Sequence, residues 1–200
     1  MINRLSVTQK LVLSFVFVII VGSILLSLPI SHYANSPETS YLDHLFNTVS
    51  MVCVTGLSVV PVSKAYNGLG QILSMLLMQT GGLGLVSLIA FSTYTLKNKL
   101  GLSDQDLLQS ALSRDNQKDL KAYLFKVYKI TFSIEAMAAL VIMTDFIPRF
   151  GLGHGIFNSL FLAVSAFCNA GFDVLGANSL IGYQNNLIIN LVIPGLIIMG

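Results

Sequence analysis

The sequence predicts an all-α polytopic membrane protein. Three observations support this fold class: the composition, the spacing of the apolar stretches and an internal repeat. Of the 200 residues, 54% are hydrophobic and only 10% are charged, and the mean hydropathy is +0.77. Soluble globular domains carry about 25% charged residues. The composition therefore indicates a chain that lies largely within a lipid bilayer.

The first predicted element is a membrane span near the N-terminus. After the polar opening MINRLSVTQK, the run Leu11–Leu28 holds 18 uncharged residues. At about 1.5 Å per residue, a helix of this length can cross the hydrocarbon core. Because no small-residue cleavage signal follows it, we expect this segment to remain in the protein as a signal-anchor.

Three further apolar stretches are long enough to predict spans. No charged residue lies between Lys64 and Lys97, so Gly68–Leu96 is expected to form one tilted helix. The next spans are predicted from Val127 to Ile147 and from Leu187 to Gly200. The polar block between the second and third spans has leucines at helical intervals, which is typical of an amphipathic surface helix or a docking face.

Two shorter apolar patches, Tyr41–Val54 and Gly155–Cys168, are predicted to be re-entrant helices. With 14 residues each, they reach only about 20 Å, which is too short to cross a bilayer. If neither patch crosses, nine of the eleven lysines and arginines lie on one side of the membrane. The positive-inside rule then places the N-terminus and residues 97–125 in the cytoplasm.

An internal repeat relates the two halves of the chain. With an offset of 115 residues, LFNTVSMVCVTGLSV (Leu45–Val59) and LFLAVSAFCNAGFDV (Leu160–Val174) share seven of fifteen residues. The matched spacing is helical up to Cys53 and Cys168, and each unit then leaves the helix through a glycine. We therefore expect the order span, short helix, extended segment and span to occur twice.

The extended segment after each short helix is the candidate functional element. Irregular backbone survives at membrane depth only where protein buries it or where it lines an aqueous cavity. Backbone carbonyls can replace the water around an alkali cation, and glycine allows the backbone to present them. Ser40 and Asp43 form a candidate N-terminal cap, so the negative end of the first short helix would point inward. The alternative is a broken transporter helix with a purely structural loop.

At these residues the chain resembles a known family. The stretches VCVTGLSVV, QTGGLGLVSL and SAFCNAGFDVL are similar to those of the Ktr/Trk/HKT potassium transporter superfamily, and the KtrB-type membrane subunit in particular. The resemblance implies tandem repeats of helix, re-entrant pore helix with filter loop, and helix. It implies potassium uptake across the plasma membrane, with backbone ligands from Gly56 and Gly171. The implied filter residues are Val54, Thr55, Gly56 and Leu57, continuing to Ser58, and Asn169, Ala170, Gly171 and Phe172, continuing to Asp173.

The chain departs from the family pattern in its number of repeats. Members of the family carry four units, whereas two are present here: residues 1–97 and 126–200, joined by a linker at 98–125. The last helix ends at Gly200, which aligns with the first glycine of the GG pair at Gly81. We therefore expect the N-terminal part of a protein about twice as long, or a truncated gene product. A two-unit chain that dimerises is the alternative.

The resemblance also implies partners. These are membrane lipid, a second copy of the full-length subunit, and a cytosolic nucleotide-binding ring of the KtrA type. No nucleic-acid partner and no cofactor are expected: K⁺ is the transported ion, and coupling to Na⁺ and selectivity for K⁺ over Na⁺ stay open. The sequence has no HExxH, P-loop or GxSxG motif, so we do not expect an enzyme. The alternative function is a non-transporting membrane scaffold or assembly protein with the same fold.

Several single residues carry narrower expectations. Glu135 in the third span should pair within the protein or face a cavity, because a lipid-facing carboxylate is costly. Asp173 should either raise the local cation concentration or hydrogen-bond its own loop. Both cysteines, Cys53 and Cys168, are expected to be small buried residues. The histidines are expected to be solvated: His32, His44 and His154.

Overall fold

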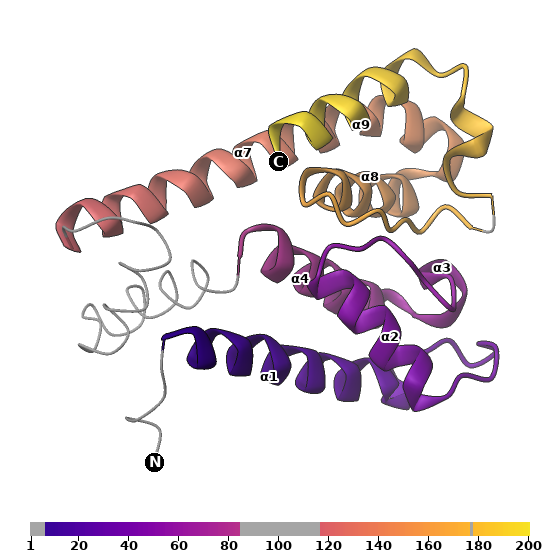
Figure 1. The fold of residues 1–200 in the computed structure, drawn as a ribbon. Coiled ribbons are helices and arrows are strands. Elements are labelled where there is room, and N and C mark those ends of the chain that lie inside the picture. Colours follow the sequence, from indigo (N-terminus) through magenta and orange to yellow (C-terminus); the bar gives the residue numbers. More distant parts are fainter. Residues whose placement is uncertain (1–6, 85–116, 177) are drawn as a thin grey trace.

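The computed structural model describes residues 7–84, 117–176 and 178–200. The described residues form helices and loops, with one isolated β-bridge between His32 and Tyr66. The predicted all-α fold class is confirmed. Helices α1 (Val7–Ser27) and α7 (Gln117–Phe150) lie on opposite sides of the molecule, and most of the other helices lie between them (Figure 1).

The first unit follows the predicted order. Helix α1 covers the predicted first span, and a short 3-10 turn, η2 (Pro29–Ser31), follows it. The short helix is α2 (Tyr41–Val52). After it come α3 (Val62–Ala65) and α4 (Gly68–Gly82). The predicted continuation of α4 to Leu96, and most of the polar block after it, lie outside the described residues.

The second unit repeats this order. Helix α7 is followed by α8 (Leu152–Phe167), the 3-10 turn η3 (Ser179–Tyr183) and α9 (Leu187–Met199). With 34 residues, α7 extends beyond the predicted span at both ends. Residues 117–126 are mostly good helix formers, so a helix begun in the membrane can continue into this polar stretch. The chain turns into α8 at Gly151, whose φ is +78°.

Hydropathy and length give a membrane-spanning signal within the described residues. The segment Ala122–Phe150 of α7 is long and apolar enough to cross a membrane. Three shorter helical segments are also apolar: Val12–Ser27, Leu152–Phe167 and Leu187–Met199. The unit boundaries at 97, 98–125 and 126 stay a prediction, because residues 85–116 are not described.

The two short helices begin differently. At α2, the Ser40 backbone N–H donates to Asp43 Oδ2 (2.8 Å), and the Asp43 N–H donates to Ser40 Oγ (3.4 Å). The predicted cap is therefore confirmed as a capping box. Helix α8 begins after Gly151 without a side-chain cap.

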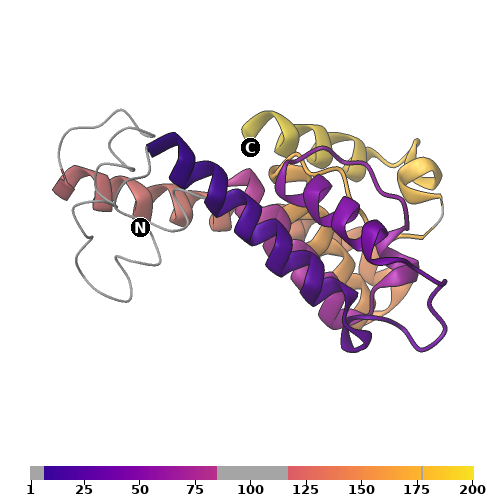
Figure 2. The same ribbon diagram turned by 60° about the horizontal axis from the view of Figure 1, so that its bottom comes forward.

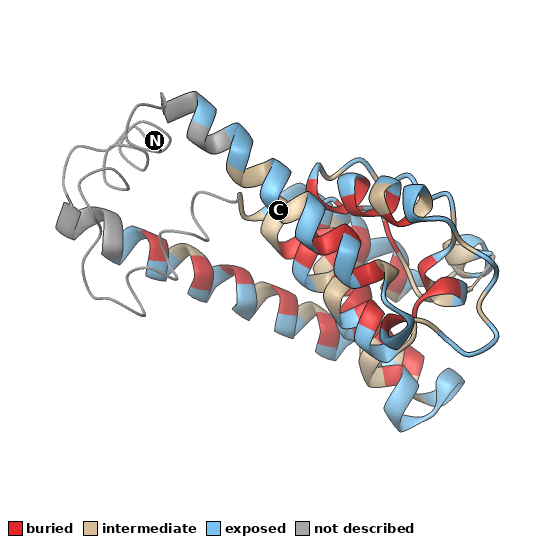
Figure 3. Cartoon of the chain, turned by 90° about the horizontal axis from the view of Figure 1, so that it is seen from below, coloured by how far each residue is buried: buried red, intermediate tan, exposed pale blue. Residues whose placement is uncertain are grey.

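Each short helix packs against the opening helix and the closing helix of its own unit. Helix α2 contacts α1 and α4, and α8 contacts α7 and α9. Helix α4 also contacts α8 and so joins the two units (Figures 1 and 2). Figure 3 shows the buried residues concentrated where these helices meet, with exposed residues along the outer faces.

Glycines let the closing helices approach the ends of the short helices. A side chain at Gly81 of α4 would clash with the backbone oxygens of Val52 and Met51. At the matching position, a side chain at Gly200 would clash with the Phe167 carbonyl. This equivalence supports the alignment of Gly81 with Gly200 made from the sequence.

The structure corrects two expectations about histidines. His44 is buried and shares a 2.9 Å hydrogen bond with the Tyr66 hydroxyl through Nδ1. His32 is half-buried, and its ring lies 4.7 Å from that of His44. Both rings lie against the ring of Tyr66, at centroid distances of 5.6 and 5.7 Å, and the local sequence did not indicate this contact between distant residues. Burial, with the nearby His32, lowers the pKa of His44. His154 is exposed, as expected.

Candidate functional site

The first candidate filter segment leaves α2 through a tight turn. Cys53 ends the helix, and Val54 (φ +56°) and Gly56 (φ +77°) both adopt left-handed backbone conformations. The Thr55 N–H donates to the Ser50 carbonyl at 2.8 Å. The segment therefore turns back over the last turn of its own helix.

The second segment has the same backbone geometry. Asn169 (φ +55°) and Gly171 (φ +71°) occupy the positions of Val54 and Gly56. The Ala170 N–H donates to the Ser165 carbonyl, again at 2.8 Å. Since left-handed φ is uncommon outside glycine, its occurrence at both Val54 and Asn169 marks one local motif used twice.

The two candidate filter glycines, Gly56 and Gly171, lie against each other. A Cβ atom at Gly171 would lie 3.1 Å from Gly56 Cα, and a Cβ at Gly56 would lie 3.2 Å from the Ala170 carbonyl oxygen. Both positions therefore need glycine for two reasons: the positive φ and the closeness of the opposite backbone. Residues 115 positions apart in the chain meet at one place.

A serine in each short helix holds the residue after the filter glycine. The Leu57 N–H donates to Ser50 Oγ at 2.9 Å, and the Phe172 N–H donates to Ser165 Oγ at 2.9 Å. These serines are not among the residues predicted for the site. The signal was present, since Ser50 and Ser165 are one of the seven identical pairs of the repeat.

The chain beyond each filter glycine is held in different ways. In the first unit, the Asn47 side chain donates to the Val60 carbonyl (3.0 Å) and accepts from the Val59 N–H (3.1 Å). The position equivalent to Asn47 is Leu162, which has no polar group.

In the second unit, the chain beyond Gly171 is held by Asp173, an acidic residue of the loop itself. Asp173 accepts from the Leu175 N–H (2.8 Å) and from Ser179 Oγ (2.5 Å). These bonds favour the loop-holding role for Asp173 over a purely electrostatic one.

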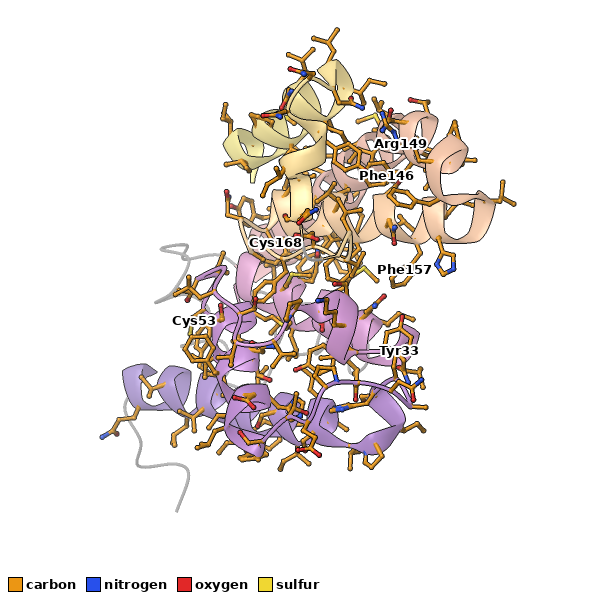
Figure 4. The ribbon with its side chains drawn as sticks, turned by 90° about the vertical axis from the view of Figure 1, so that its right-hand side faces the viewer. Tyr33, Cys53, Phe146, Arg149, Phe157 and Cys168 are labelled. Carbon is orange, nitrogen blue, oxygen red and sulfur yellow. The ribbon has the colours of Figure 1, made fainter. Side chains whose placement is uncertain are left out.

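A polar contact between the units lies beside the second segment. Gln79 of α4 donates to Glu135 of α7 at 2.9 Å and accepts from the Cys168 thiol at 3.4 Å. The expected pairing of Glu135 within the protein is confirmed, and its partner is Gln79. Cys168 is buried as expected, whereas Cys53 is exposed, so that expectation is wrong for Cys53. Figure 4 shows Cys168 where the two units meet, while Cys53 lies within the first unit.

A cavity of about 210 Å³ lies behind the second filter segment, between α8, η3 and α9. Its lining includes Ser165, Asn169, Gly171 and Asp173, with Leu162 and Ile193. Asn169 Nδ2 also donates to the Ile197 carbonyl of α9 (3.3 Å). The second segment is therefore tied to the closing helix of its own unit.

The chemistry of the site rests on backbone rather than side-chain groups. Among the described residues, no three His, Cys, Asp or Glu side chains gather at metal-binding distance. Paired glycine segments at the ends of two short helices can offer carbonyl oxygens, and helix C-termini carry partial negative charge. Such an arrangement suits a weakly hydrated monovalent cation.

The fold and this site define a class: a polytopic membrane protein with duplicated short helices whose glycine loops converge. Comparison with known proteins identifies the family. The family model described as TrkH, cation transport protein, matches residues 6–200. The chain belongs to this family of membrane cation transporters.

Named relatives fit this assignment. The chain is 37% identical over 199 residues to the potassium/sodium uptake protein NtpJ of Enterococcus hirae, covering 99% of this chain and 44% of the relative. It is 36% identical over 197 residues to the Ktr system potassium uptake protein B of Bacillus subtilis, covering 98% of this chain and 43% of that relative. For the protein of that name from Vibrio alginolyticus, identity is 34% over 190 residues, covering 95% and 41%. The chain thus spans less than half the length of these curated relatives.

Proposed function

We propose that this chain supplies two of the filter segments that line the cation path of a Ktr/Trk-type potassium uptake system in the plasma membrane. The observation that carries the proposal is the meeting of Gly56 and Gly171. Each lies at the end of a short helix, each has a left-handed φ, and each faces the other. Two segments form only part of a wall around an ion, so further segments must come from elsewhere in the assembly.

The proposed filter residues are those predicted from the resemblance: Val54, Thr55, Gly56 and Leu57, with Asn169, Ala170, Gly171 and Phe172. K⁺ is the proposed cargo, held by backbone oxygens of the two glycine segments. The names of the relatives support potassium as cargo, and one of them adds sodium. Sodium is therefore proposed as a coupling or competing ion.

The proposed orientation places the N-terminus and residues 97–125 in the cytoplasm, as the distribution of lysine and arginine predicts. The proposed partners are a second copy of the full-length subunit and a cytosolic nucleotide-binding ring of the KtrA type. Support for a multi-subunit system comes from relatives named as proteins of the Ktr system.

The test is rubidium uptake in cells that lack their own potassium uptake. The 200-residue chain is compared with the complete reading frame, meaning the same chain together with its native downstream sequence. Uptake that needs the complete frame supports a filter completed by further units of one polypeptide, and uptake by the short chain supports a filter completed by a second copy. Absence of uptake from both, with both present in the membrane, contradicts the proposal and favours the scaffold alternative.

A further inference from the structure

Two buried serines at matching positions hold the filter segments. Ser50 and Ser165 are 3% and 1% exposed, and each lies in the last turn of its short helix. Each accepts two backbone N–H groups from the filter segment that follows it. The carbonyl takes the N–H before the glycine, and the hydroxyl takes the N–H after it.

These bonds determine which way the filter carbonyls point. A peptide unit is planar and trans, so the C=O of one residue points opposite to the N–H of the next. None of the peptide bonds in the described residues is cis. The Leu57 N–H points to the Ser50 hydroxyl, so the Gly56 carbonyl points away from α2. The same relation directs the Gly171 carbonyl away from α8.

Of the two hydrogen bonds that each serine accepts, only the bond to its hydroxyl depends on the identity of the side chain. The bond from Thr55 to the Ser50 carbonyl would form with any residue at position 50, because a backbone atom accepts it. The bond from Leu57 needs an acceptor on the side chain. Without that acceptor, the peptide between Gly56 and Leu57 can rotate, since glycine permits many backbone conformations.

We infer that Ser50 and Ser165 are positioning residues of the cation path, whose hydroxyls orient the filter glycine carbonyls and so set discrimination between monovalent cations. The inference rests on the proposed function for its cation, but its geometric part stands on the hydrogen bonds alone. Two serines from two units make the same bond at the same length, 2.9 Å.

The experiment uses S50A and S165A in the complete reading frame. Rubidium uptake is measured with and without competing sodium and normalised to the amount of protein in the membrane. Because one hydrogen bond is worth about a three- to tenfold change in an equilibrium, the rubidium-to-sodium preference should fall by about that factor. In S50C and S165C the side chain has a similar shape but is a weaker acceptor, so their rubidium-to-sodium preference should lie between those of the wild type and the alanine variants.

Matched controls are available in the same two helices. Ser159 and Thr48 are fully buried, and their hydroxyls donate only to carbonyls of their own helices, at Gly155 and His44. S159A and T48V should therefore leave the cation preference unchanged. A change in the controls as large as that in S50A and S165A would show a general packing effect and overturn the inference.

Hydrogen exchange of the purified protein separates this inference from the proposed function. In S50A, the peptide containing Leu57 should exchange about three- to tenfold faster, and in S165A the peptide containing Phe172 should do so. Unchanged exchange and unchanged preference in both alanine variants would overturn the inference. If wild type takes up no rubidium, the proposed function fails, and exchange alone decides whether the serines hold the segments.

Discussion

The two proposed filter segments share one backbone geometry but differ in their surroundings. In the first, Thr55 is exposed and Leu57 is 58% exposed, and Val59 just beyond the segment is 54% exposed. In the second, Ala170 and Phe172 are 0% and 5% exposed and pack into the core of the first unit. The turn, the left-handed positions and the serine bonds are nevertheless the same. The geometry therefore arises from each short helix and its own loop, whereas burial comes from the neighbouring unit.

Helix α4 contributes to this difference. It closes the first unit, and it also covers the end of α8 in the second. A side chain at Gly82 would clash with Cys168. Within the described residues, no helix covers Cys53 in the corresponding way. Substitutions at Gly56 and at Gly171 should therefore have similar effects, whereas substitutions in α4 should affect the second segment more than the first.

The largest effect is expected at the filter glycines. Gly56→Asp and Gly56→Ser, and the same substitutions at Gly171, should reduce rubidium uptake by more than tenfold while leaving membrane insertion intact. A side chain at either position would occupy a left-handed backbone conformation and press on the opposite segment. The measurement is uptake per inserted molecule in the complete reading frame.

Gly68→Ala is the control for these variants. Gly68 opens α4, and a Cβ there would meet nothing within 4 Å. Unchanged uptake in a Gly56 variant, with loss only in the Gly171 variant, would break the equivalence of the two segments.

The next effect is expected at the contact between the units. Gln79→Leu removes the donor to Glu135 and the acceptor for Cys168, leaving a buried carboxyl without its partner. Loss of a buried hydrogen-bond partner costs about 1–3 kcal/mol. The thermal unfolding midpoint in detergent should therefore fall. Backbone hydrogen exchange should rise more in the second segment than in the first.

Glu135→Gln is the matched control, because an amide at this position can still accept from the Gln79 side chain. It should change the midpoint less than Gln79→Leu does. An equal rise in hydrogen exchange in both segments of Gln79→Leu would contradict the view that α4 supports the second segment more than the first.

A smaller effect is expected from Asn47→Leu, which gives the first unit the residue found at position 162. The substitution removes the bonds to Val59 and Val60 beyond Gly56, and a longer bond of 3.5 Å to the Tyr66 hydroxyl. Because Val59 is exposed, water can replace part of the loss, and we expect about 1 kcal/mol of destabilisation. The unfolding midpoint and exchange of the peptide at 57–61 measure it.

Thr48→Val, in the next residue of the same helix, serves as the control for Asn47→Leu. Its hydroxyl bonds only within α2, so the loop should keep its protection. Unchanged hydrogen exchange of the peptide at 57–61 in Asn47→Leu would show that Asn47 does not hold the chain beyond Gly56.

The smallest effect is expected at the cap of α2. Bonds from the Ser40 backbone and hydroxyl lower the pKa of Asp43 below its ordinary value of 3.8. The capped form is the carboxylate, so its stabilising effect is fully present above pH 3.8 and is lost as the pH falls through the lowered pKa. The wild-type midpoint should therefore drop slightly more than that of Asp43→Asn between pH 5 and pH 3. Parallel profiles would show that the cap contributes nothing measurable.

The sequence was informative where a constraint is local. The positive-φ glycines, the capping box and the two short helices all follow from residues close together in the chain, and the repeat made them visible twice. The pairing of Gln79 with Glu135 could not be predicted, because it joins residues 56 positions apart. The inward turn of His44 and the exposure of Cys53 depend likewise on which helices pack nearby. Asn47 holds the loop of the first unit and Asp173 holds that of the second. The repeat could not show this, because the two residues are not at equivalent positions.

The two cysteines offer a chemical readout of assembly. Cys168 is buried with its thiol directed to Gln79, so a thiol-specific reagent should reach it slowly. Cys53 occupies the matching position with its surface open in the described part of the chain. Any further unit that covers the first segment as α4 covers the second would shield Cys53 from the same reagent. The labelling rate of Cys53 would then report whether a further unit covers the first segment.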